Sequence, residues 1–133
     1  MIKYSLYIIA LGLLFLFATC KSSINPENLY GKWKYIKVEN PNANPPDSVT
    51  ALELAQQSPY ILFTSKDSLL IYWDGKVLSH GVFTVDGRNI QYKETLVDGK
   101  TREFPFYVSE LTEKNLKFST KGTDGSEVTA VKQ

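Results

Sequence analysis

The sequence predicts an all-β domain, an eight-stranded antiparallel up-and-down barrel with one long loop and a short helical segment after its first strand. Short runs of β-branched and aromatic residues alternate in polarity with the two-residue period of strands. Asp-Gly pairs, which favour tight hairpin turns, separate runs at 74–75, 86–87, 98–99 and 124–125. From residue 27 onward, no long segment has the 3.6-residue period of an amphipathic helix.

The first 19 residues have the layout of an export signal. Lys3 precedes a run at 6–18 that has no charge and is shorter than the roughly 20 residues that a permanent membrane helix needs. We therefore expect a cleaved signal peptide at 1–19, a lipidated cysteine and polar tether at 20–26, and one barrel domain at 27–133.

Residues 16–20, Leu-Phe-Ala-Thr-Cys, resemble the lipobox of bacterial lipoproteins. The resemblance implies that Cys20 carries two or three acyl chains, such as palmitate, which anchor the protein in the cell envelope. Cys20 is also the only cysteine, so it cannot form an intramolecular disulfide. An Asp after the lipidated cysteine resembles an inner-membrane retention signal of some bacteria. Lys21 and Ser22 stand there instead, which favours the outer membrane. Whether the protein faces the periplasm or the cell surface stays open.

Charge and composition argue against several functions. Loss of Lys3 with the signal reduces the 15 basic residues to 14, equal to the 14 acidic ones, so we expect no nucleic-acid partner. His80 is the only histidine and stands on the predicted outer face. No second histidine or free cysteine exists to build a zinc site, so we expect no metal, no cofactor and no catalytic residue.

The turn signals divide the domain into strands. The expected strands are 30–39, 60–65, 68–73, 76–85, 89–96, 101–111, 115–121 and 126–132. Closing this meander into a barrel removes its two exposed edges. In the first strand the charged residues change face part-way, which predicts a β-bulge near Tyr35 and Ile36.

The single long connection follows the first strand at 40–57. Its three prolines, Pro41, Pro45 and Pro46, favour irregular backbone. Thr50 and Glu53 have the spacing of a capping box, which predicts a helix over 51–57. A loop of this length is often a lid, and we expect that role here.

Alternation within the strands places a set of bulky side chains inside the barrel, with Val77 at the start of the same inward pattern. The candidate ligand-binding residues are Trp73, Phe83, Tyr92, Phe104, Phe106 and Phe118. Arg102 shares their face, where it would bind a ligand's anionic group or pair with Glu94. The aromatic set could line a cavity or fill the barrel as a packed core, and the sequence leaves both open.

Leu29-Tyr-Gly31-Lys-Trp33, at the start of the first strand, is similar to the Gly-x-Trp signature of lipocalins. The resemblance implies that Trp33 plugs the closed end of a barrel that encloses a small hydrophobic or amphipathic ligand. The chain differs from that family in lacking the usual Arg on the last strand and the C-terminal helix. The alternative function is a non-catalytic structural, interaction or inhibitor module that has a solid core and docks an envelope protein.

Overall fold

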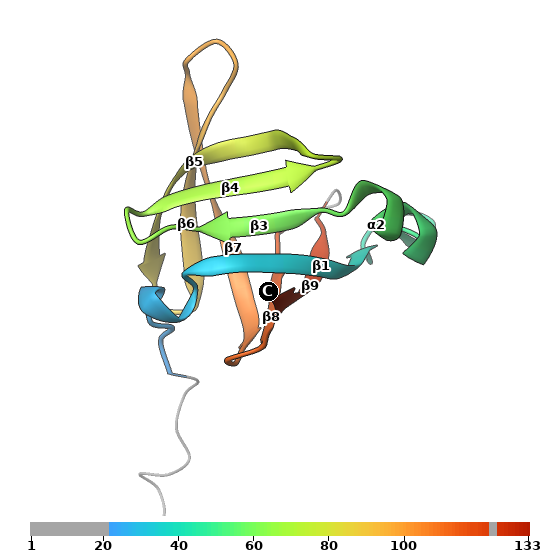
Figure 1. The fold of residues 1–133 in the computed structure, drawn as a ribbon, viewed down its shortest axis with the longest axis horizontal. Coiled ribbons are helices and arrows are strands. Elements are labelled where there is room, and N and C mark those ends of the chain that lie inside the picture. Colours follow the sequence, from blue (N-terminus) through green and yellow to red (C-terminus); the bar gives the residue numbers. More distant parts are fainter. Residues whose placement is uncertain (1–21, 123–124) are drawn as a thin grey trace, which may run out of the picture.

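A computed structural model describes residues 22–122 and 125–133 of the chain, so the predicted signal peptide and Cys20 lie outside the described residues. The strands form a closed antiparallel barrel (Figure 1). They are β1 (Gly31–Asn40), β2 (Asp47–Ser48), β3 (Tyr60–Phe63), β4 (Ser68–Trp73), β5 (Lys76–Asp86), β6 (Asn89–Thr95), β7 (Thr101–Leu111), β8 (Asn115–Ser119) and β9 (Glu127–Lys132). Each strand from β3 to β8 pairs with the next, and β1 pairs with both β3 and β9. The predicted eight-stranded barrel is confirmed, with β2 as an additional short strand.

The two ends of the barrel differ. The 3-10 helix η1 (Pro26–Asn28), the C-terminus and the turns at 64–67, 87–88 and 112–114 gather at one end, which we call the closed end. The turn at 74–75, the loop at 96–100, residues 120–122 and 125–126, and α2 (Ala51–Gln57) gather at the other, which we call the mouth. Within the described ranges, no helix is long and apolar enough to cross a bilayer.

The bulge predicted in the first strand is confirmed. The register of β1 against β9 shifts between Tyr35 and Lys37, so Ile36 is the extra residue. Tyr35 and Val38 therefore both point into the core, where they are 5% and 8% exposed, while Ile36 is 50% exposed. The bulge thus lets one strand keep its apolar residues inside although its alternation is interrupted.

Two of the Asp-Gly pairs make different turns. Trp73 pairs with Lys76, so Asp74 and Gly75 are the central residues, and both have positive φ (54° and 73°), as the predicted turn requires. Asp86, in contrast, pairs with Asn89, which makes Gly87 and Arg88 the central residues. The prediction of an Asp-Gly centre is wrong at 86–87 because the strand pairing runs one residue further.

The long connection after β1 is fastened to the barrel. The helix α2 is confirmed, and the backbone N–H of Glu53 donates to Thr50 Oγ1 at 3.1 Å, as an N-cap does. Leu54 of α2 is buried in the core, and the N–H of Asp74 donates to the carbonyl of Gln57 at 2.8 Å. Residues 47–48, expected to be irregular because of the preceding prolines, instead form β2 against the end of β1.

The strand β5 is paired with β6 along only part of its length. From Gly81 onward it pairs with β6, whereas its first residues pair only with β4. A Cβ at Gly81 would collide with the backbone carbonyl of Lys93, so only glycine allows this close crossing. The predicted inward position of Val77 is wrong, since this residue is 46% exposed. The register of β5 against β4 shifts so that Ser79 pairs with Ile71 and Val77 with Tyr72, and the extra residue, Leu78, places Val77 on the opposite face from Ser79.

Candidate functional site

The closed end is sealed by Trp33 and Leu29, both fully buried. The indole Nε1 of Trp33 donates to the carbonyl of Leu29 at 2.7 Å, which ties the chain before β1 across the end of the barrel. This is the position in which the Gly-x-Trp resemblance places the tryptophan. The predicted structural pair, Gly31 and Trp33, therefore lies at the sealed end and away from the mouth.

Lys132 of β9 lies beside Trp33, a contact that was not predicted from the sequence. Its Nζ lies 4.6 Å from the centre of the Trp33 ring, and it donates to the carbonyl of Tyr30. Partial burial lowers the pKa of Lys132. Gly31 has a φ of +120°, which only glycine adopts readily, and a Cβ there would also lie 2.7 Å from this Nζ and displace the end of the lysine side chain. The signal that could have revealed Lys132 is its register opposite Trp33.

The middle of the barrel is filled by aromatic rings. Phe83, Tyr92, Phe106 and Phe118 are each at most 4% exposed. The centroid of the Phe106 ring lies 5.2 Å from that of Phe118 and 5.6 Å from that of Tyr92, which are distances of packed aromatic pairs. Four of the candidate ligand-binding residues thus belong to the packed core.

A polar network lies above these rings, toward the mouth. Glu94, which interrupts the apolar face of β6, is only 9% exposed. Its carboxylate accepts from Arg102 Nε at 2.5 Å and from the hydroxyl of Ser79, and that hydroxyl lies 2.7 Å from the hydroxyl of Tyr92. Of the two roles predicted for Arg102, the structure shows the pairing with Glu94, which satisfies a carboxylate that would be costly to bury alone.

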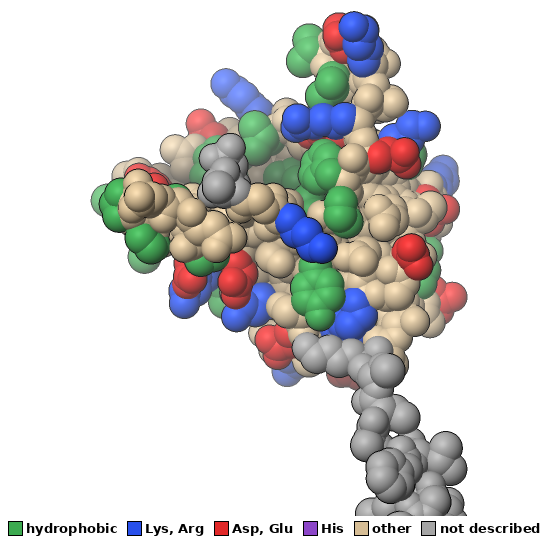
Figure 2. Space-filling model, turned by 180° about the vertical axis from the view of Figure 1, so that it is seen from behind, with side chains coloured by type: hydrophobic (Ala, Val, Ile, Leu, Met, Phe, Trp, Pro, Cys, Tyr) green, Lys and Arg blue, Asp and Glu red, His purple; other side chains and the backbone are tan. Residues whose placement is uncertain are grey.

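The remaining candidates, Trp73, Phe104 and Arg102, reach the mouth. Trp73 and Phe104 are partly buried against the core, and the Arg102 side chain is 63% exposed. The Arg102 guanidinium lies 5.3 Å from the centre of the Phe104 ring. Figure 2 shows, from behind, that the surface between α2 and the projecting β6–β7 hairpin is hollowed, with hydrophobic side chains on its floor.

Two hollows meet at Arg102. One, of about 320 Å³, is lined by Arg102, Phe104, Pro105, Thr120 and Lys121. The other, of about 510 Å³, lies where β5 and β6 diverge and is bounded by residues 77–80, residues 94–97 and Arg102. The first combines an aromatic face with two cationic side chains. It can therefore hold a small molecule that has an apolar body and an anionic group.

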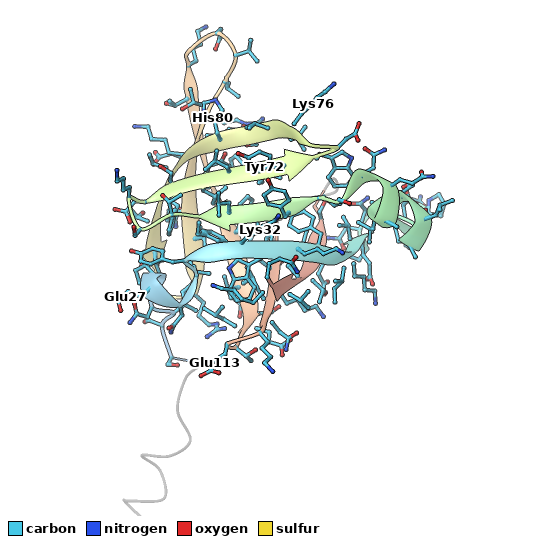
Figure 3. The ribbon with its side chains drawn as sticks, viewed as in Figure 1. Glu27, Lys32, Tyr72, Lys76, His80 and Glu113 are labelled. Atoms are coloured by element: carbon cyan, nitrogen blue, oxygen red, sulfur yellow. The ribbon has the colours of Figure 1, made fainter. Side chains whose placement is uncertain are left out.

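Comparisons with protein-family models, with curated proteins and with solved structures found no match. The geometry of the barrel therefore carries the functional argument. His80 is exposed on β5, as predicted, and borders the larger hollow (Figure 3). Within residues 22–122 and 125–133, no group of three or more His, Cys, Asp or Glu side chains is placed to hold a metal ion.

The segment before β1, expected to be a tether, is held against the closed end in its described part. Ile24 is 8% exposed, and its N–H donates to the carbonyl of Gly87 at 2.9 Å. Arg88 donates from Nη1 to the carbonyl of Ser22 and from Nε to the carbonyl of Val108, both at 2.9 Å. Arg88 thereby clamps the chain leaving the barrel to β7, a role that sequence reasoning missed.

The outer face of β1, β3 and β4 carries a stacked ladder. The rings of Tyr60 and Tyr72 are stacked 4.5 Å apart, and Lys32 Nζ lies 4.1 Å from the centre of the Tyr60 ring. Figure 3 shows Lys32 and Tyr72 on this wall of the barrel, between its two ends. The ladder fits cross-strand stabilisation of the wall.

The buried tyrosines predict a loss of stability at alkaline pH. Burial raises the pKa of Tyr35 and, together with the carboxylate of Glu94, that of Tyr92. Above pH 10, the ordinary tyrosine pKa, the unfolded chain binds fewer protons than the folded one, so the free energy of unfolding falls as pH rises. Lys132, whose pKa is lowered, has the opposite effect. We expect Tyr35→Phe to flatten the fall measured by urea unfolding between about pH 9 and 11; an unchanged slope would contradict the assignment to Tyr35.

Proposed function

We propose that this protein is a lipid-anchored, lipocalin-like protein of the cell envelope that binds a small amphipathic molecule at the mouth of its barrel. The ligand's apolar part lies against Phe104, and its anionic group faces Arg102 and Lys121. The lipid on Cys20 holds the protein in a membrane, and the outer membrane is the location that the residues after Cys20 favour.

The observation that carries this proposal is the hollow of about 320 Å³ at the mouth, which joins the half-buried ring of Phe104 to the exposed side chain of Arg102. Binding sites for small molecules are concave, mostly apolar, and have a few polar groups that fix orientation. Below this hollow the barrel is packed with rings, so the site lies at the mouth and not deep within the barrel.

The charge of Arg102 is only partly used within the protein. Its Nε donates to Glu94, while most of its side chain remains in contact with solvent. Guanidinium groups have several donors in a planar fork, so a second acceptor can bind beside the first. Lys121, which is exposed and also lines the hollow, adds a second positive charge. A carboxylate or similar anion is therefore favoured over a cationic headgroup.

Residues 21–133, prepared without the lipid, allow a direct test. We expect native mass spectrometry to detect retained small molecules and a fluorescent fatty-acid probe to bind. Phe104→Ala is expected to weaken probe binding about tenfold, because a loss of about 1.4 kcal/mol corresponds to that factor. Arg102→Gln is expected to weaken an anionic probe and to leave an uncharged probe of the same chain length unchanged.

Tyr72→Phe is the matched control, because the Tyr72 ring stacks on Tyr60 on the outer wall of the barrel and lines neither of the hollows that meet at Arg102. It should bind the probe as the unchanged protein does. Absence of any bound apolar probe, or equal affinity of the Phe104→Ala and Tyr72→Phe variants, would contradict the proposal.

A second function, docking of an envelope protein, is favoured by exposed apolar side chains near the mouth. Val97 at the tip of the β6–β7 hairpin is fully exposed, and Leu78 and Val77 on β5 are 67% and 46% exposed. Exposed apolar patches often mark contact surfaces. On this alternative the barrel is solid, and substitution of Val97 by Ser would abolish partner capture while leaving probe binding at Phe104 unchanged.

A further inference from the structure

We propose that the closed end of the barrel lies against the lipid surface and that the mouth points away from it. This inference rests on the lipid anchor proposed above.

Only a short stretch of chain separates the proposed anchor from the barrel. Ser22 is the first described residue, and its carbonyl is held by Arg88 Nη1 at 2.9 Å. Only Lys21 stands between Ser22 and Cys20. Two residues of fully extended chain span at most about 7 Å, so a lipid on Cys20 keeps this end of the barrel within reach of the headgroups.

The segment that leads to the anchor is held against the barrel at several points. Ile24 is buried in the core, its N–H donates to the carbonyl of Gly87, and Arg88 also binds the carbonyl of Val108. Release of this segment from the barrel would expose the Ile24 side chain to water and would break these hydrogen bonds. The segment therefore acts as a strap, here defined as residues 22–24 with Arg88, and not as a flexible linker.

The mouth lies at the other end of the barrel. In Figure 3, Glu27 and Glu113 mark the end from which the strap leaves, and Lys76 and His80 lie toward the opposite one. The strand β7 joins the two ends through 11 residues. With about 3.3 Å per residue and a strand tilt of about 35–45°, the mouth lies about 25–30 Å from the closed end.

Charge attraction is not needed for this orientation. The turns at the closed end carry neighbouring residues of opposite sign, as in Glu113 and Lys114. A mixed surface has no strong preference for anionic headgroups, so the strap determines the orientation and salt should not change it.

The test uses the full lipidated protein in vesicles of phosphatidylethanolamine and phosphatidylglycerol whose headgroups carry a nitroxide quencher. Because Cys20 is the only cysteine and bears the lipid, Glu113→Cys or Asp98→Cys introduces a single free thiol for a fluorophore. Both positions are exposed acidic turn residues, one at the closed end and one at the mouth. We expect quenching to be several-fold stronger at position 113, at low and at high salt.

Equal quenching at the two positions, or stronger quenching at 98, overturns the proposed orientation while leaving the anchor intact. A protein that does not float with the vesicles, or a Cys20→Ala variant that floats equally well, overturns the anchor and the orientation with it. Arg88→Ala should loosen the strap and reduce the difference between the two labels. Arg102→Ala removes an arginine at the mouth instead of the closed end and should preserve the difference in quenching. An undiminished difference in the Arg88→Ala variant would overturn the role of the strap.

Discussion

Phe106→Ala is expected to lower the free energy of unfolding by about 3–5 kcal/mol, the usual cost of removing a buried phenylalanine ring. Phe106 is 4% exposed, and its ring lies within 5.2–5.6 Å of those of Phe118, Phe104 and Tyr92. Its removal leaves a cavity among rings that cannot all move to fill it. Urea unfolding followed by far-UV circular dichroism measures the loss.

Phe104→Ala is the matched control for this prediction, since Phe104 is on the same face of β7 but only partly buried. We expect it to cost about 1–2 kcal/mol, because a half-exposed ring contributes only part of the transfer free energy of a buried one. If Phe106→Ala costs no more than Phe104→Ala, the middle of the barrel is a cavity wall and not a packed core. Probe affinity would then change with Phe106 as well.

Trp33→Ala is expected to destabilise the protein by about 5 kcal/mol, at the upper end for a buried aromatic residue. The substitution removes a fully buried ring, leaves the carbonyl of Leu29 without its donor, and takes away the surface on which Lys132 rests. Since domains are stable by about 5–15 kcal/mol, the variant should be marginal at best. The milder Trp33→Phe should cost about 1–3 kcal/mol, mainly through the unpaired carbonyl.

The other tryptophan provides the comparison. Trp73 is partly buried near the mouth, where a cavity left by its removal is open to water. Trp73→Ala is therefore expected to cost clearly less than Trp33→Ala in the same urea titration. Equal losses for the two variants would show that sealing the closed end is not what Trp33 contributes.

The sequence predicts much of this fold because its local signals agree with the final topology. Alternating strands and turn residues define all eight strands of the barrel, and the Thr50 cap defines the one α-helix among the described residues. The bulge at Ile36 was predictable because a change of face in a strand has few other physical explanations.

What the sequence does not predict depends on where strands shift their register and where side chains from distant segments meet. Val77 fits the inward pattern, but the extra residue Leu78 shifts the register of β5 against β4, and the alternation of β5 gives no sign of this bulge. Arg88 and Lys132 act on Ser22 and on Tyr30 with Trp33, residues that are far away in the chain. Likewise, aromatic periodicity cannot distinguish a filled barrel from a hollow one, since both need the same inward positions.

Closure of the barrel joins the two ends of the domain, because β1 pairs with β9 from Trp33 and Lys132 to Glu39 and Glu127. Contacts between the first and last strands carry a large loop-closure entropy and form slowly, whereas the hairpins from β3 to β8 involve near neighbours. Until β9 is in place, β1 and β8 each present an unpaired edge on which another chain can add a strand. The final six-residue strand thus decides when a newly synthesised chain ceases to be prone to aggregation.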